Sequence, residues 1–212
     1  MRLLGESSEA EMVLTFLCEE ITSPRFRGRI LEALDGEGAG EGLVLRGDTG
    51  NREENALRAR VLGAFRGYPD REIFENYPQD MRWTRVLLEA ADLPRLRYVD
   101  YDYWNELSRG TSCPLGAAET IREGREVFGV SNAPYLQGRA FLEGGGRFPP
   151  LILLTCARGP LLILEGHCRA TALALAPQAV QGTEALLGTT SEADFRKKAG
   201  HLFRYPDKED ML

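Results

Sequence analysis

Apolar side chains recur at helical spacing through most of the first 92 residues. Ser8 and Glu11 have the spacing of a capping box, which predicts that a helix starts here. Ser23-Pro24 predicts a second start, because Ser is a good N-cap and Pro suits the first helical position. The periodicity as a whole predicts four helices, over about residues 8–21, 23–35, 51–65 and 79–91.

After Pro94 the pattern changes to shorter, mixed elements. Two apolar runs, 151–156 and 161–164, flank a turn at residues 157–160, which is typical of two buried antiparallel strands. Further short strands are predicted at 96–99 and 184–187, and short helices at 101–107, 114–122, 135–143, 170–176 and 192–199. The polar tail, 204–210, is expected to be loose. The predicted fold is therefore α+β, with a helical region over residues 1–92 and a small mixed-sheet domain over 93–212.

Composition and charge narrow the class of protein. Acidic residues outnumber basic ones by 32 to 26, so a nucleic-acid partner bound by bulk electrostatics is not expected. The longest apolar run, residues 149–154, is far too short to span a membrane. Four widely spaced cysteines and two histidines form no zinc pattern, so free thiols and no metal site are predicted. No apolar leader follows Met1, and a cytoplasmic location is expected.

The residues best suited to chemistry lie where the second buried strand meets the next helix, at Glu165-Gly166-His167-Cys168-Arg169. A helix amino end offers N–H groups and a partial positive charge, and Gly166 lets the backbone turn sharply and a ligand approach closely. Arg169 could hold a phosphate or carboxylate through two N–H groups. His167 could donate to the same anion or move a proton, and Glu165 could bind Mg²⁺ or act as a general base.

A structural interpretation of the same five residues stays open. In that interpretation Gly166 only makes a turn, Arg169 pairs with a nearby acid, and His167 is an ordinary surface residue. Local chemistry alone favours neither interpretation.

The segment around this turn resembles the ParB/sulfiredoxin-like superfamily. The shared pattern is a helix, a strand that begins near a Pro-Ile/Leu pair, a hairpin, and a strand ending in an acidic-Gly-x-x-Arg motif that opens a helix. Here the predicted helix 135–143 comes first, Pro150-Leu151 begins the strand, and Glu165 to Arg169 supplies the motif. The resemblance covers about residues 95–190 and is sharp over 148–172. The segment 104–108 also looks like those of bacterial relatives.

The resemblance implies a nucleotide site at this turn. ParB-like domains bind nucleotide phosphates there and some hydrolyse CTP, free-serine kinases use ATP or ADP, and sulfiredoxin uses ATP with a catalytic cysteine. By this resemblance Gly166, Cys168 and Arg169 would bind phosphate, and Glu165 and His167 would be catalytic, with ATP or another NTP and Mg²⁺. Sulfiredoxin has Gly-Cys-His-Arg where this chain has Gly-His-Cys-Arg, and no helix-turn-helix follows the motif. Neither sulfinic-acid reduction nor chromosome partitioning is therefore expected.

Two functional hypotheses follow. The first is a nucleotide-dependent enzyme acting on a small molecule, as a phosphotransferase or an NTPase. The second is a non-catalytic module that recognises a protein or nucleic acid, in which the turn keeps only a structural role.

Other chemically interesting residues are interpreted as structural. Cys156 is expected in the core, and Cys168 as a small, half-buried packing residue, although thiolates are favoured near helix amino ends. The acidic-aromatic group is expected to be half-buried packing rather than the lining of a substrate pocket; it comprises Asp100, Tyr101, Asp102, Tyr103 and Trp104. The arginines at 25, 27 and 29 are expected on a solvated helix face rather than in a phosphate or RNA site.

Overall fold

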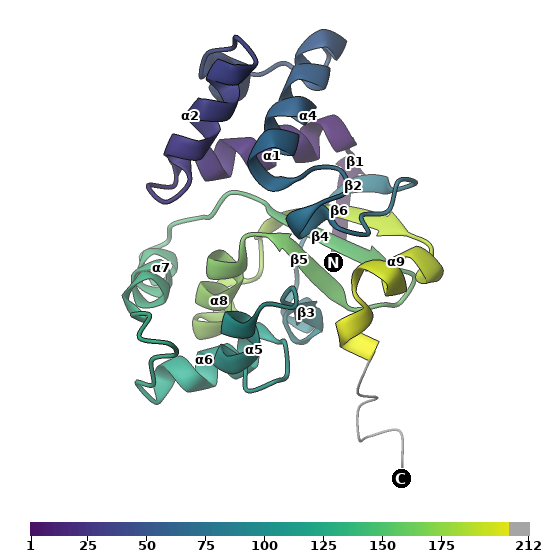
Figure 1. Cartoon of the computed structure of the whole chain (residues 1–212). Coiled ribbons are helices and arrows are strands. Elements are labelled where there is room, and N and C mark those ends of the chain that lie inside the picture. Colours follow the sequence, from purple (N-terminus) through teal and green to yellow (C-terminus); the bar gives the residue numbers. More distant parts are fainter. Residues whose placement is uncertain (204–212) are drawn as a thin grey trace. The chain divides into compact units, whose positions relative to one another are not determined.

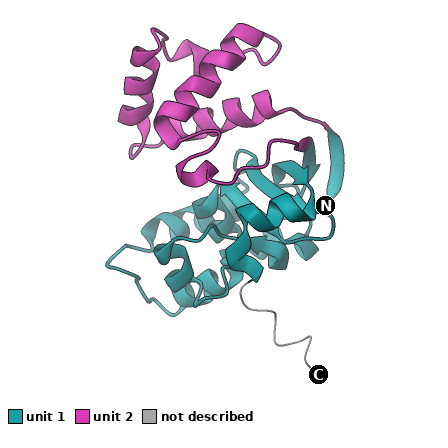
Figure 2. Ribbon diagram, turned by 45° about the vertical axis from the view of Figure 1, so that its right-hand side comes forward, with its two compact units in different colours: residues 1–5, 84–212 teal, residues 6–83 magenta. Residues whose placement is uncertain are grey.

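The computed structural model describes residues 1–203, which form two compact units (Figures 1 and 2). Unit 2 spans residues 6–83, and unit 1 contains residues 1–5 together with the chain from residue 84 onward. Unit 2 is therefore an insertion within the chain of unit 1. The predicted tail, residues 204–210, lies outside the described residues.

Unit 2 is built from helices whose apolar faces meet. Its elements are α1 (Glu9–Thr22), α2 (Arg27–Gly36), α3 (Gly42–Leu45), α4 (Arg52–Arg66) and the 3-10 helix η1 (Glu72–Phe74). Helices α1, α2 and α4 pack against one another around fully buried side chains such as Phe16, Ile30 and Phe65. The two long helices carry side-chain caps: Ser8 accepts the N–H of Glu11 at 3.2 Å, and Asn51 accepts two N–H groups of α4.

The predicted start of the second helix is wrong by three residues. Ser23 has extended backbone angles, and its N–H donates to the Glu20 carbonyl, so it ends α1 instead of opening α2. Helix α2 begins at Arg27, and Phe26 precedes it without a side-chain cap.

Unit 1 contains a six-stranded mixed sheet with the strand order β1-β2-β6-β4-β5-β3. Its strands are β1 (Arg2–Glu6), β2 (Arg82–Leu87), β3 (Leu96–Arg97), β4 (Leu151–Cys156), β5 (Leu161–Glu165) and β6 (Glu184–Thr190). The predicted hairpin is confirmed, because β4 pairs antiparallel with β5. Strand β4 also pairs parallel with β6, and β5 parallel with β3. All six residues of β4 are buried, as expected of a central strand. The α+β class predicted from the sequence is confirmed.

The remaining described elements of unit 1 are helices. They are η2 (Ala90–Arg95), α5 (Asp102–Leu107), α6 (Pro114–Arg122), α7 (Ala133–Glu143), α8 (His167–Leu175), η3 (Pro177–Ala179), α9 (Glu192–Lys198) and η4 (Gly200–Phe203). Helices α6 and α7 both pack against α8 (Figure 1), and a buried cluster joins them to Leu153 of β4 and Ile163 of β5. Among the described residues, no helix has the length and apolar character needed to cross a bilayer.

The expectation that residues 1–92 are all helical is wrong at both ends. Residues 2–6 form β1, and the helix predicted over 79–91 is replaced mainly by β2. The spacing of Trp83 and Val86 suits a helix, but β-branched and aromatic residues also favour strands, and strand pairing is what the structure contains. The N–H of Leu88 donates to the Thr183 carbonyl at 2.8 Å, a contact that sequence periodicity cannot reveal.

Candidate functional site

The predicted turn is a single glycine corner between β5 and α8. Strand β5 ends at Glu165, Gly166 has φ 100° and ψ 24°, and α8 begins at once with His167. A Cβ at Gly166 would lie 2.4 Å from Cδ2 of Leu151, so both the backbone conformation and the available space require glycine. The helix begins three residues earlier than predicted, and His167, Cys168 and Arg169 therefore form its first turn.

Arg169 is held on two sides of this corner. Its Nη2 donates to the Glu165 carboxylate at 3.0 Å, and its Nη1 donates to the carbonyls of Pro149 and Pro150 at 3.1 and 3.2 Å. The side chains of Arg169 and Glu165 are both largely buried, at 12% and 17% exposure. The pair therefore ties the start of α8 to the end of β5 and to the segment that leads into β4.

His167 is packed against aromatic rings rather than placed on the surface. Its residue exposure is 9%, and its ring stacks on Trp104 of α5 at 5.3 Å between centroids, with 16° between the ring planes. The ring of Tyr98 lies 6.0 Å from the His167 ring and stacks on Trp104 at 4.6 Å. The hydroxyls of Tyr98 and Thr171 lie 2.7 Å apart, and Thr171 donates to the His167 carbonyl at 2.8 Å. These contacts hold the first turn of α8 against Trp104 and Tyr98.

Cys168 is the exposed side chain of the first turn. Cys113 and Cys156 are buried and Cys18 is partly buried, so the prediction that Cys156 is in the core is confirmed, while the half-buried placement predicted for Cys168 is wrong. None of the four thiols is in a disulfide, as predicted.

Two tyrosines pack against Trp104, the ring that stacks on His167. Tyr103 of α5 and Tyr135 of α7 are hydrogen-bonded to each other at 2.9 Å. Burial raises the pKa of both phenols above the ordinary value, and a negative charge on the nearby Cys168 sulfur adds to the rise. Both phenols therefore stay protonated, and because one of the two protons lies in the bond between them, the pair has one O–H left to donate.

The residues of the acidic-aromatic group, 100–104, lie in different surroundings in the structure. Tyr103 and Trp104 lie at the corner, whereas Tyr101 is 45% exposed and Asp100 accepts from the side chain of Asn105. Sequence reasoning missed Tyr98 and Tyr135, which complete the aromatic surface. For Tyr98 the available signal was an aromatic residue inside the predicted strand 96–99, but its partner Thr171 on α8 lies 73 residues further along the chain.

The described residues offer few side-chain ligands for a metal ion. Within residues 1–203, no group of three or more His, Cys, Asp or Glu side chains could hold one. At the corner Glu165 is the one carboxylate of the predicted set, and one of its oxygens accepts from Arg169.

Comparisons with known proteins were made at three levels. No protein-family description, curated protein or solved structure matches this chain. The resemblance to the ParB/sulfiredoxin-like superfamily therefore stays a prediction from the sequence motif.

Proposed function

We propose that unit 1 binds a nucleotide at the glycine corner, with the phosphates at the amino end of α8. The observation that carries the proposal is the direct passage from Gly166, in the left-handed conformation, into a nine-residue helix without a side-chain cap. The N–H groups of a first helical turn point outward along the axis, and the helix dipole favours an anion there.

Each predicted residue has a role that its position supports. Gly166 lets the chain turn sharply from β5 into α8, and the backbone of Cys168 lies in the first turn. Arg169 neutralises charge at the rim while it keeps its bond to Glu165. His167 presents its backbone, because its ring is stacked on Trp104. The hydroxyl of Tyr103, which is only half-buried, suits the sugar or a second polar group while Tyr135 holds it in place.

A Mg²⁺ ion fits this site only as a partner of the nucleotide. Mg²⁺ is commonly held by substrate phosphates, waters and one or two carboxylates, and Glu165 supplies one carboxylate. The reaction class that follows is transfer of a phosphoryl group to a small molecule or to water. In it, the Glu165 oxygen that is not bonded to Arg169 would either meet Mg²⁺ or accept the proton of the attacking hydroxyl. The four free thiols agree with a reducing, cytoplasmic setting for this reaction.

One observation favours the second hypothesis, a non-catalytic module. Arg169 is already engaged by Glu165 and by two prolyl carbonyls, which is the structural interpretation of the motif. In a module of this kind the corner only fastens β5, α8 and the segment before β4 together, and recognition of a protein or nucleic acid takes place elsewhere.

A ligand panel separates the two functions. With ATP, ADP, CTP and GTP, each with Mg²⁺, at least one nucleotide should raise the melting temperature, because a ligand bound by the native state stabilises it by about 2.7 kcal/mol at one hundred times its Kd. Arg169→Gln should weaken the binding free energy of that nucleotide by about 1.5–3 kcal/mol, the value of a charged hydrogen bond.

Arg122 provides the matched control for that variant. It also fastens α8, through a 3.0 Å bond to the Ala174 carbonyl, but at the opposite end of the helix. Arg122→Gln should lower stability without changing nucleotide affinity. If no nucleotide shifts the melting temperature, the enzyme hypothesis fails and the module remains.

A further inference from the structure

The two edges of the six-stranded sheet differ in length. The sheet ends on one side in β3, which has two residues, and on the other in β1, which has five and lies next to the amino terminus (Figure 2). An edge strand presents N–H and C=O groups that no neighbouring strand takes up, and a very short edge strand limits their number. Among the described residues no further strand pairs with β1, so β1 is the longer open edge.

The bond that follows β1 shows which main-chain groups face this open edge. The N–H of Ser7 donates to the Trp83 carbonyl in β2 at 3.1 Å, so the main chain of Ser7 faces β2. Along an antiparallel strand the N–H and C=O groups of alternate residues point to the same side. The residues of β1 whose groups face away from β2 are therefore Arg2, Leu4 and Glu6.

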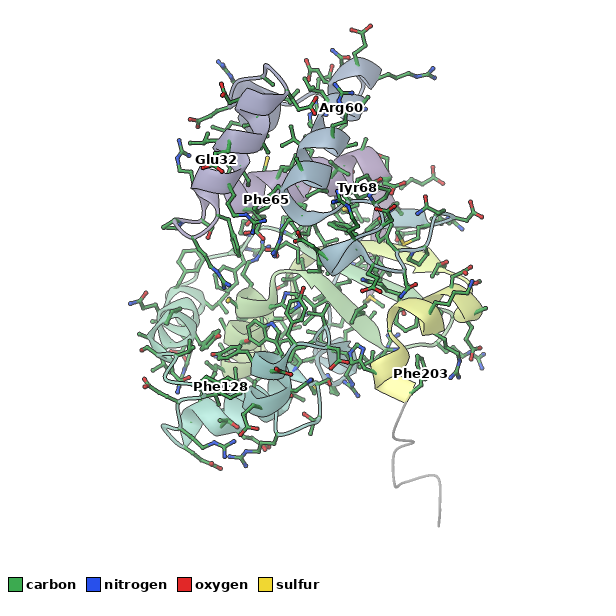
Figure 3. All side chains as sticks on the ribbon, viewed as in Figure 1. Glu32, Arg60, Phe65, Tyr68, Phe128 and Phe203 are labelled. Carbon is green, nitrogen blue, oxygen red and sulfur yellow. The ribbon has the colours of Figure 1, made fainter. Side chains whose placement is uncertain are left out.

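The side chains of β1 are apolar and exposed on both of its faces. Leu3 is 64% exposed and Leu4 42%, and successive side chains of a strand point to opposite faces. Exposure alone does not mark an edge: Phe128 is 69% exposed (Figure 3), but it lies in a turn closed by a bridge between Val127 and Val130. Strand β1 combines exposed apolar side chains with an open main chain, which is the arrangement to which another strand adds.

The sequence of β1, Arg-Leu-Leu-Gly-Glu, is complementary to itself in the antiparallel direction. When two copies pair about Leu4, Arg2 of each copy lies opposite Glu6 of the other, and Leu4 lies opposite Leu4. Leu3 lies opposite Gly5, which leaves room for the larger side chain. Opposite charges and apolar pairs across two strands are both stabilising, whereas an in-register parallel pairing would bring like charges together. Within residues 1–203, neither Arg2 nor Glu6 has an ion-pair partner that competes for its charge.

We propose that β1 is a dimerisation strand, which pairs antiparallel with β1 of a second copy of this chain about a twofold axis at Leu4. The outward N–H and C=O groups of the two copies then bond to each other, and the two sheets become one. Both copies use the same surface, so the contact closes at two chains and does not continue into a fibre. One pair of short strands is smaller than a standard interface, and we expect a reversible dimer with a Kd of about 10–100 µM. The interface is independent of the nucleotide site proposed on α8.

Sedimentation equilibrium of the full chain and its charge variants tests the pairing. Arg2→Glu puts like charges opposite each other twice in the dimer and should raise the Kd about fivefold or more, whereas Arg2→Glu/Glu6→Arg should restore it to within about twofold. Arg52→Glu makes the same change of charge at an exposed position of α4 and should leave the Kd within about twofold. A chain that stays monomeric up to about 500 µM, or a charge exchange that restores nothing, would overturn the proposal.

Cysteine cross-linking tests the register. Leu4→Cys should form a disulfide between two copies on mild oxidation, because the Cα atoms of a directly opposite, hydrogen-bonded pair lie about 5.5 Å apart. Leu3→Cys is the matched control, since its new thiol would lie opposite Gly5 and not opposite its own copy. Mass spectrometry of the linked peptides separates these bonds from any formed by the exposed Cys168. Equal cross-linking of the two variants, or links through Cys168 alone, would contradict pairing about Leu4.

Discussion

Gly166 carries two constraints at one residue, a positive φ and a side-chain neighbour where a Cβ would be. With its φ of 100°, a residue with a side chain would be strained at this position. An added Cβ would also lie 2.4 Å from the side chain of Leu151 of β4. Because Leu151 belongs to the central strand, it has little room to move. The geometry of the whole corner therefore depends on this glycine.

Gly166→Ala should lower the free energy of unfolding by about 2–4 kcal/mol, the sum of backbone strain and overpacking. Gly124 provides the control: its φ is also positive, at 73°, but an added Cβ would meet nothing within 4 Å. Gly124→Ala should cost only about 1–2 kcal/mol. Urea denaturation of both variants measures the difference, and equal losses would mean that the contact with Leu151 is unimportant.

The sequence predicts the residue types of the corner but not their partners. The motif was visible because a buried strand, a glycine and an arginine follow one another locally. The Glu165–Arg169 ion pair depends on α8 starting at His167, whereas the predicted start was Ala170, so the one-turn spacing of the two side chains was hidden. The stacking of His167 on Trp104 joins segments far apart along the chain, and single-sequence patterns contain no information about such contacts.

Helix α4 shows how an element can depend on a buried charge. Arg58 is fully buried, and its guanidinium donates to the carbonyls of Leu43 and Asp48 and to the side chains of Asn55 and Glu54. These bonds fasten α4 to the short helix α3 and to the loop between them. On the sequence Arg58 looks like any other polar position of an amphipathic helix.

Arg58→Leu should destabilise the protein by about 3–5 kcal/mol, because it leaves several buried acceptors without a donor. Arg60, two residues along the same helix, is 57% exposed and pairs with Glu37. Arg60→Leu should change stability by about 1 kcal/mol or less. Thermal and urea unfolding of the two variants test this; similar losses would contradict a structural role for Arg58.

Elements stabilised by local signals were predicted well, and those that need a distant partner were not. The 151–165 hairpin and helix α6 (Pro114–Arg122) follow from turn residues and apolar spacing close by in the sequence. Strands β1 and β2 lie together at one end of the sheet order, and β2 neighbours β6, which follows about a hundred residues later. Without knowledge of β6, the apolar residues of β2 fit a helix as well as a strand.

At the scale of the whole molecule, unit 2 interrupts unit 1 between two strands that are neighbours in the sheet. The N–H of Ser7 donates to the Trp83 carbonyl at 3.1 Å, so the chain enters and leaves unit 2 at adjacent points. Insertions with adjacent ends disturb a host domain little.

Replacement of residues 8–80 by a short Gly-Ser linker should therefore leave unit 1 folded. We expect a cooperative thermal transition and a nucleotide affinity close to that of the full chain. A molten, non-cooperative product would show that unit 1 needs unit 2 to fold, and a folded product without nucleotide affinity would show that the corner of α8 is not the complete site.

The most direct test of the central claim uses the exposed thiol beside the corner. Cys168 should be the fastest cysteine to react with iodoacetamide, since Cys113 and Cys156 are buried and Cys18 is half-buried with its thiol bonded to the Val44 carbonyl. If phosphates occupy the amino end of α8, a saturating nucleotide with Mg²⁺ should slow alkylation of Cys168 by about tenfold or more and leave Cys18 unchanged. Mass-spectrometric mapping of the labelled peptides gives both rates. An unchanged rate at Cys168, with the nucleotide demonstrably bound, would contradict the account.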